Sequence, residues 1–417
     1  MFNNKRRNTP RLRLFPFYMK IKKALLRKKR KKESWFKYGM AILHLWLGLL
    51  SSIVVLIVCL TGSIYAFKNQ INDFYNREKV FVTTPKNDSI NIAAIEHFFK
   101  KEGNTIKTIV IPESSNRSLS ISYSEENSSF IKTQYFNPYT FDLLGYNNNR
   151  LDDFFKLILD IHKTLLIPNI GKQIVGISTI IFCLLLLSGI ILWLPKTFRD
   201  LKNGLTIKWK AKFYRINYDL HKTFGFYSFI VLLFIALTGL YITYPWMKNV
   251  FIVSLGGNPV LSKGDALEEN DELSVDFNDM LAKMMIKEDD KKSLENVKPI
   301  SFDSIYKLAN KKLSYKATTS IVAPNKEDSE FRITKINTQN WLGAMLPDEL
   351  SFDKKGNLKH MQKFSDKPLH KQFIEISKPL HTGEILGWKS VLFYFLFTLI
   401  GCSLPITGFI IWWKKLK

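Results

Sequence analysis

Residues 38–67 read YGMAILHLWLGLLSSIVVLIVCLTGSIYAF, a run of 30 residues that contains no Lys, Arg, Asp or Glu. An α-helix rises about 1.5 Å per residue, so a run of this length can cross the ~30 Å hydrocarbon core of a bilayer. Three further blocks have the same character, and they cover residues 174–194, 224–246 and 391–413. The sequence therefore predicts a mainly α membrane protein with a bundle of four transmembrane helices.

The net charge of +25 is concentrated outside these blocks. Fifteen of the Lys and Arg residues lie in residues 1–37, and eight more lie in residues 196–222 beside only two acids. Positive segments stay on the cytoplasmic side of a membrane, so both segments and the basic tail 414–417 are expected inside, where they can contact anionic lipid. The basic residues have no interleaved aromatic platform, so nucleic-acid binding is not expected.

Alternation of the four spans places both termini in the cytoplasm and both long polar segments outside. The predicted segments are a basic cytoplasmic segment (1–37), the first span (38–67), an outer domain (68–160), an amphipathic lead-in with the second span (161–195), a cytoplasmic loop (196–222), the third span (223–247), a second outer domain (248–378), a lead-in with the fourth span (379–413) and a cytoplasmic tail (414–417).

Each outer segment is expected to form a small α+β domain, because a helical pattern in residues 92–101 or 301–311 is followed by short β-type runs. The expected strands are residues 105–111, 118–124, 131–136, 317–323, 331–337 and 350–353, with turns at 137–140 and 353–357. Neither segment shows a catalytic triad, a metal-ligand cluster or a phosphate loop. Binding, gating or shielding is the role that their sequence supports.

The two halves of the chain share the spacing of four histidines. His44 and His221 are each followed by Gly four residues on, and by Thr-Gly seventeen and eighteen residues on. His162 and His381 each precede Ser-Gly or Thr-Gly by 26 and 27 residues. Each half holds two spans, so the halves form a parallel repeat, and equivalent residues of such repeats lie at the same depth. His44 is therefore predicted to meet His221 near the cytoplasmic surface, and His162 to meet His381 near the outer surface.

Histidines paired in this way point to b-type haem. A bis-histidine haem needs two neutral imidazoles that approach the iron from opposite faces, in a dry slot between helices. The sequence thus predicts two haem b groups, with His44, His221, His162 and His381 as axial ligands of the iron. A lone His near a membrane boundary is more often an interfacial or hydrogen-bonded residue. It is the repeated spacing that favours ligation here.

Other conspicuous residues are assigned ordinary roles. The small residues of the repeat are assigned to helix packing, namely Thr61, Ser188, Thr238, Thr407 and the glycines that follow them. Span-end tryptophans are taken as interfacial anchors, namely Trp193, Trp412 and Trp413. Cys59, Cys183 and Cys402 form no metal-type spacing and are assigned to packing. His97 and His360 are expected on the surface, and His370 is a second candidate beside His381 or lines the outer approach.

With these residues in place, nearly the whole chain resembles the bacterial PepSY-associated transmembrane family. The segments that carry the likeness are residues 44–48 (HLWLG), 219–222 (DLHK), 379–384 (PLHTGE), the Thr-Gly pairs at 61–62, 238–239 and 407–408, and the closing WWK at 412–414. Turns near residues 139–145 and 353–358 resemble PepSY-type outer modules, although Thr140-Phe141 stands where Thr-Gly is expected. The resemblance implies an inner-membrane protein with two small α+β PepSY-like periplasmic domains. It also implies a function like that of members that bind haem b and reduce ferric siderophores in the periplasm.

The leading hypothesis is therefore an oxidoreductase that carries electrons from an inside donor, a quinol or a cytoplasmic reductase, to a ferric siderophore outside. The alternative is a membrane-anchored PepSY sensor or inhibitory module that binds a peptidase or envelope partner without redox chemistry. A third hypothesis is transfer of haem to another protein. Nothing in the alternative requires paired histidines, so the visible spectrum of the protein discriminates between the first two hypotheses.

Overall fold

The computed structural model describes residues 29–31, 33–83, 90, 92–125, 131–146, 149–195, 197–259, 300–325 and 329–415. Most of the predicted basic segment, residues 1–28, lies outside the described residues. The chain divides into two compact units. The helical unit comprises the residues up to Ala66, Lys156–Tyr244 and those from Leu392 on. The sheet unit comprises Phe67–Phe155 and Pro245–Val391.

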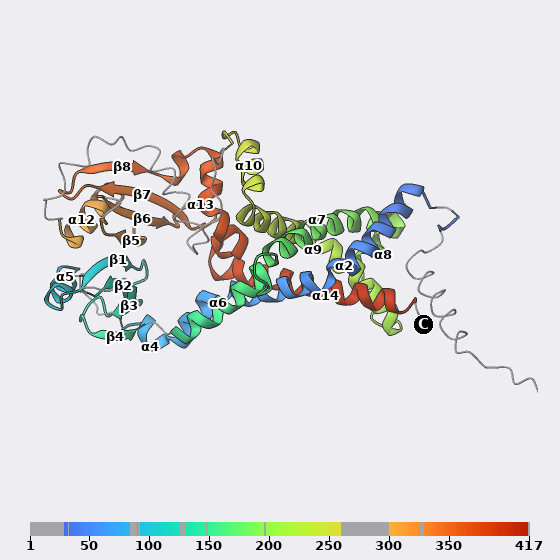
Figure 1. The fold of residues 1–417 in the computed structure, drawn as a ribbon, viewed down its shortest axis with the longest axis horizontal. Helices are drawn as coiled ribbons and strands as arrows, with labels where there is room; N and C mark the ends of the chain where they lie inside the picture. Colours follow the sequence, from blue (N-terminus) through green and yellow to red (C-terminus); the bar gives the residue numbers. More distant parts are fainter. Residues whose placement is uncertain are drawn as a thin grey trace, which may run out of the picture. The chain divides into compact units, whose positions relative to one another are not determined.

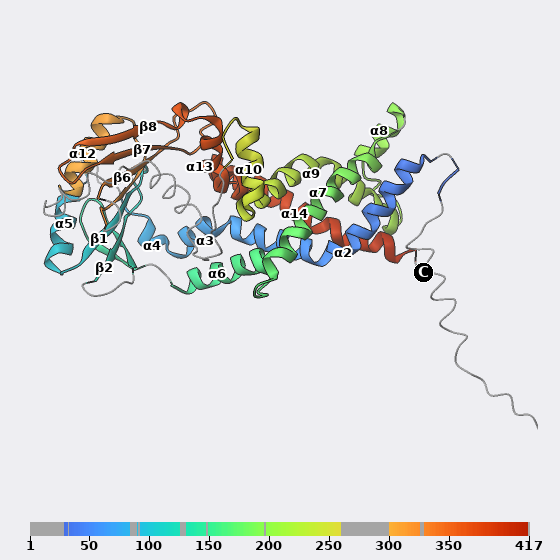
Figure 2. The ribbon, with the colours of Figure 1, turned by 45° about the horizontal axis from the view of Figure 1, so that its top comes forward.

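Four helices of the chain are long and apolar enough to cross a membrane, as predicted. They are α2 (Trp35–Ala66), α7 (Gly171–Trp193), α9 (Phe213–Thr243) and α14 (Trp388–Trp413). Helix α2 packs along α7, and α7 packs along α9 (Figures 1 and 2). Helix α9 begins at Phe213, ten residues before the predicted residue 223, because nearly three turns with several polar side chains extend the helix before the apolar block.

Small residues bring the four helices close together. A Cβ added at Gly48 would contact Leu185 at 3.7 Å, and one added at Gly225 would contact Leu404 at 3.9 Å. These two glycines hold equivalent places in the predicted repeat, and both serve close helix contact. Ser63 of α2 donates a hydrogen bond of 2.8 Å to Thr398 of α14. Close backbones and hydroxyl pairs of this kind are how helices associate within lipid.

The lead-in helices are not continuous with the spans that follow them. Helix α6 (Asn149–Thr164) ends in a break where Leu165, Leu166 and Asn169 have left-handed backbone angles, with φ of 54°, 58° and 60°. Helix α13 (Leu369–Thr382) is separated from α14 by Gly383, the 3-10 turn η4 (Glu384–Leu386) and Gly387. The two glycines have φ values of 81° and 70°, respectively. His162 and His381 therefore lie on the last turn of short helices, whereas the lead-ins and spans were predicted as single segments.

Gly171 closes the first of these breaks. A Cβ at this position would lie 1.9 Å from the backbone oxygen of Thr164, which cannot move without disturbing the end of α6. We expect Gly171→Ala to lower the unfolding free energy by about 1–3 kcal/mol through overpacking, measured as thermal unfolding of the purified protein in detergent. Gly39→Ala is the matched control, since nothing lies within 4 Å of its added Cβ. Equal stability of the two variants would contradict this role of Gly171.

The strands of both polar segments join in one sheet, in the order β4-β3-β2-β1-β5-β6-β7-β8 (Figure 1). The first segment contributes β1 (Thr105–Ile111), β2 (Leu119–Ser124), β3 (Ile131–Phe136) and β4 (Leu143–Tyr146). The second contributes β5 (Thr318–Val322), β6 (Phe331–Asn337), β7 (Leu346–Phe352) and β8 (Leu358–Gln362). The predicted strands are present, β4 and β8 were not foreseen, and the turn at residues 353–357 connects β7 to β8 as predicted.

The sheet corrects the prediction of two separate small domains. Strand β1 pairs antiparallel with β5, with Ile109 opposite Ile321. Without this pairing each set of four strands would expose an unpaired edge of backbone N–H and C=O groups. Helices α5 (Ile92–Lys101) and α12 (Phe302–Lys312) share one hydrophobic core with the strands. The two polar segments thus form a single α+β unit. Among the described residues this unit also contains α13, η4, α3 (Lys68–Tyr75), α4 (Arg77–Val80), α10 (Pro245–Ser254) and the 3-10 turn η3 (Phe364–Asp366).

The departure from the expected Thr-Gly turn has a structural cost. Phe141 has a φ of 63°, in the left-handed region that side chains with a Cβ rarely adopt. The corresponding turn between β7 and β8 has Gly356 at a φ of 88°. Phe141 packs against the hydrophobic core of the sheet unit. This apolar contact offsets the backbone strain, and the loop between β3 and β4 is one residue longer than the loop between β7 and β8.

Candidate functional site

His44 of α2 and His221 of α9 face each other inside the helical unit. Their ring centroids are 6.2 Å apart, and the ring planes are inclined at 87°. Each side chain is partly buried. Two imidazoles that bind one metal ion from opposite sides lie about 6 Å apart between ring centres, given metal–nitrogen bonds of about 2 Å. The observed separation therefore suits a shared metal.

A hydroxyl from a neighbouring helix holds each of these rings. The Nδ1 of His44 lies 2.9 Å from the Oγ of Ser188 on α7, and the Nδ1 of His221 lies 2.9 Å from the Oγ1 of Thr407 on α14. Both hydroxyls also donate within their own helices, Ser188 to the backbone oxygen of Leu185 at 3.1 Å and Thr407 to that of Ser403 at 2.8 Å. A hydroxyl has only one hydrogen to donate, so it accepts from the histidine. The network assigns the proton to Nδ1 and leaves the Nε2 lone pair of both rings available.

His162 of α6 is held in the same way at the other end of α2. Its Nδ1 lies 3.0 Å from the backbone oxygen of Val58 and 3.2 Å from the Oγ1 of Thr61. A carbonyl oxygen only accepts, so Nδ1 carries the proton here as well. Burial lowers the pKa of His162, which favours the neutral imidazole. In this tautomer the ring lone pair is again on Nε2.

The glycine after each hydroxyl gives the ring room to approach. A Cβ added at Gly189, Gly408 or Gly62 would lie 3.5, 3.3 or 3.0 Å from the Cε1 of His44, His221 or His162, respectively. Ser-Gly or Thr-Gly therefore forms a seat for a histidine, in which the hydroxyl fixes Nδ1 and the glycine accepts the ring edge. The sequence assigned these residues to helix packing, and at these three positions they also hold a histidine ring. Their fixed offsets from the histidines were the signal in the sequence.

His381 lies on the last turn of α13 in the sheet unit, whereas Thr238, the residue equivalent to Thr61, lies buried in α9 of the helical unit. The meeting of His162 with His381 therefore stays a prediction. His370 lies partly buried on α13, where a Cβ at Gly257 would come within 2.7 Å of its ring. His97 and His360 are exposed, as expected.

The end of the bundle near His221 is braced by polar contacts. Asp219 is fully buried, and its carboxylate lies 3.1 Å from the Arg215 Nε and 3.8 Å from the Lys222 Nζ. Asn217 donates to the backbone oxygen of Thr407 at 3.0 Å. The Asp219 ion pairs lie within α9, and the Asn217 hydrogen bond fixes the first turns of α9 against α14. They place His221 in a rigid setting, in which its ring orientation is set by the fold.

Trp193 ties the predicted cytoplasmic loop to this end. Its indole N–H donates to the backbone oxygen of Gly204, at the end of α8 (Phe198–Leu205), over 3.1 Å. Its ring stacks on Phe226 with centroids 3.8 Å apart. Trp193 of α7 therefore contacts both α8 and α9 and holds the three helices together. The prediction of an interfacial anchor did not include this role.

The sequence model of a protein family described as the PepSY-associated TM region matches residues 41–415 of the chain. The chain belongs to this family. The match spans all four candidate spans and the sheet unit, so the paired histidines lie within the family region and not in an appended segment. No curated protein matches the chain. The resemblance drawn from the histidine motifs is thus confirmed at the level of the family.

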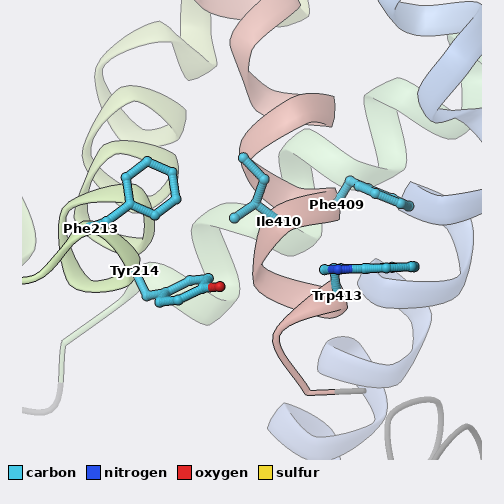
Figure 3. Close-up of a pocket in the computed structure, with 5 residues that line it drawn as sticks. All are labelled: Phe213, Tyr214, Phe409, Ile410 and Trp413. Carbon is cyan, nitrogen blue, oxygen red and sulfur yellow. The ribbon is translucent and has the colours of Figure 1, made fainter. Parts of the chain in front are cut away.

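This PepSY-associated protein has a surface cavity of about 290 Å³ that is open on one side, since its lining side chains include the exposed Phe213 and Trp413. The cavity lies between the first turn of α9 and the last turns of α14 (Figure 3). Its walls are mostly aromatic, and the lining residues are Phe213, Tyr214, Phe409, Ile410 and Trp413. The cavity was not predicted from the sequence, because its two walls are almost 200 residues apart in the chain.

Proposed function

We propose that this protein is a b-type dihaem electron-transfer protein of the bacterial inner membrane that reduces ferric siderophores on the periplasmic side. One haem would be held by His44 and His221, and the second by His162 and His381. The observation that carries the proposal is the pair of facing imidazoles, 6.2 Å apart, each held at Nδ1 by a hydroxyl.

The residues present suit haem. Iron binds a neutral imidazole through its free nitrogen, and a hydrogen bond at the other nitrogen sets the ring orientation and raises the basicity of the ligand. The seats formed by Ser188-Gly189, Thr407-Gly408 and Thr61-Gly62 supply this hydrogen bond from a rigid helix. When bound, haem supplies reversible one-electron chemistry at a potential tuned by its ligands and surroundings.

The proposed direction of electron flow follows from charge. The loop of residues 196–222 and the N-terminal segment are strongly basic, which supports a cytoplasmic location for both. The sheet unit would then lie in the periplasm. Equivalent histidines of a parallel repeat would lie at two depths, so an electron could enter near His44 and His221 and leave near His162 and His381.

The proposed acceptor rests on the family and on iron chemistry. Hard oxygen chelators hold iron(III) more tightly than iron(II), because softer, less charged iron(II) is a weaker partner for such ligands. One electron delivered to a ferric siderophore therefore loosens the complex. Release of iron would follow without hydrolysis of the chelator, so the sheet unit would need only to bind or admit the chelate.

The proposal is tested by mixing the dithionite-reduced protein, freed of excess dithionite, with a ferric hydroxamate and a chromogenic ferrous chelator. We expect rapid reoxidation of the protein, with one ferrous ion trapped for each electron lost. The His162→Ala variant should transfer electrons at least ten times more slowly, since the outer site is the exit. A protein that remains reduced in the presence of several ferric chelates, and that captures a peptidase or envelope partner instead, would favour the sensor function.

A further inference from the structure

The aromatic cavity at the ends of α9 and α14 has the features of a site for a flat ring. Four of its five lining residues are aromatic, and Tyr214 and Trp413 stand on opposite sides of Ile410 (Figure 3). Its volume of about 290 Å³ lies at the lower end of the ~300–1,000 Å³ range of small-molecule sites. That volume admits one or two fused rings, but it is too small for a porphyrin.

Polar groups lie at the border of the cavity. The Nζ of Lys414 lies 4.4 Å from the centroid of the Tyr214 ring, so a cation bridges α14 to α9 at this point. Trp412 packs against the lining residue Phe409, with ring centroids 5.5 Å apart, but does not itself line the cavity. An apolar slot with a few polar groups is the usual make-up of a site for a small organic ligand.

The cavity is joined to the His221 seat by a short run of contacts. Tyr214 precedes His221 by seven residues, so both lie on one face of α9, about 10 Å apart along its axis. Asn217, between them, donates to the backbone oxygen of Thr407, and the Thr407 hydroxyl accepts from His221. Ile410 of the cavity lies one helical turn beyond Thr407. A ring in the cavity would therefore lie close to the imidazole pair.

We propose that this cavity binds the head ring of an isoprenoid quinol. Aromatic walls stack favourably on a flat conjugated ring, and the position at the end of two spans lets an isoprenoid tail remain in the bilayer. Tyr214 and Lys414 supply hydrogen-bond donors of the kind that quinone oxygens accept. A lipid acyl chain has neither a flat face nor an acceptor to use these groups. Binding requires only the cavity, whereas the role of the quinol as electron donor rests on the proposed function.

In that role the chemistry balances with the ferric siderophore as acceptor. Oxidation of one quinol to the quinone breaks two O–H bonds and releases two protons and two electrons. Two ferric chelates each take one electron and become ferrous. The protons leave to water at the cytoplasmic end, where Tyr214 and Lys414 lie beside the ring.

The test is binding of menadione, a naphthoquinone without a tail, to the full-length protein in nanodiscs of zwitterionic lipid. We expect saturable quenching of tryptophan fluorescence, with affinity at least tenfold lower in Ile410→Trp, which fills the cavity. Leu396→Trp is the matched control on α14, because Leu396 is 52% exposed and lies outside the cavity. The Leu396→Trp variant should bind menadione with the affinity of the wild type. Because it carries an additional tryptophan, its quenching is measured relative to its own fluorescence without menadione.

Quenching that does not saturate, or that is unchanged in Ile410→Trp, would overturn the proposal. The proposal would also be overturned if phosphatidylglycerol displaced menadione at low mole fractions at which added quinone does not displace it. The cavity would then be a lipid site. The measurement does not depend on colour or on electron transfer. Saturable, Ile410-dependent binding to a colourless protein would therefore keep the quinone site and reject the dihaem function.

Discussion

Purified His44→Ala and His221→Ala proteins are each expected to retain about half of the wild-type haem, and the double variant is expected to retain the same half. The two rings face each other at 6.2 Å, so removal of either one destroys a single shared site. The effects of the two substitutions should therefore not add. Haem is counted per chain by a pyridine haemochrome assay on protein of known concentration.

The pairing is checked by combining substitutions from different predicted sites. His44→Ala with His162→Ala should leave almost no haem, because each belongs to a different site. His97→Ala serves as the control, since this histidine is exposed on α5 and should leave the haem content unchanged. Additive losses in the His44/His221 double variant would contradict a shared site.

Removal of one seat hydroxyl is expected to weaken haem retention by about 10–100-fold, the usual effect of deleting a hydrogen bond that orients a ligand. Thr407→Val keeps the shape of the side chain but leaves Nδ1 of His221 without its acceptor. Thr407→Ser restores the hydroxyl and should restore retention. The measurement is the rate at which haem passes from the protein in detergent to an excess of a soluble haem scavenger.

Thr179→Val provides a matched control within the same bundle. The Thr179 hydroxyl on α7 donates to the backbone oxygen of Val175, four residues earlier, over 2.8 Å. Thr407 donates to the backbone oxygen of Ser403 in the same way. Its substitution removes a similar hydroxyl without affecting a histidine seat. If Thr407→Val and Thr179→Val lose haem at the same rate, the hydroxyl of Thr407 has no part in holding the ligand.

Local pattern was sufficient for most of the secondary structure. Helix α5 and strands β1, β3 and β6 have the bounds that alternation and helical periodicity predicted. The joining of β1 to β5 was not visible, because it pairs residues more than 200 positions apart and no local signal marks the partner of an edge strand. The break after α6 was missed for a related reason. Leu165 and Leu166 adopt left-handed angles although leucine does not signal a turn.

The histidine pair could be predicted from the equal intervals in the two halves of the chain. These intervals predicted that His44 and His221 would meet, and their rings lie 6.2 Å apart in the structure. The seats were harder to see, since a Thr or Ser in a membrane helix already satisfies its hydroxyl on its own backbone. Thr61 does so at 2.8 Å to Ile57. The remaining lone pair of Thr61 and the backbone oxygen of Val58 together hold His162, and nothing in the sequence of α2 alone reveals this.

The most direct test of the whole account is the visible spectrum of the purified full-length protein, oxidised and then reduced with dithionite, with haem counted per chain. The account predicts sharp reduced bands of b-type haem with bis-histidine ligation and two haems per chain. A protein that is colourless as purified and stays colourless after growth with added haem would contradict it.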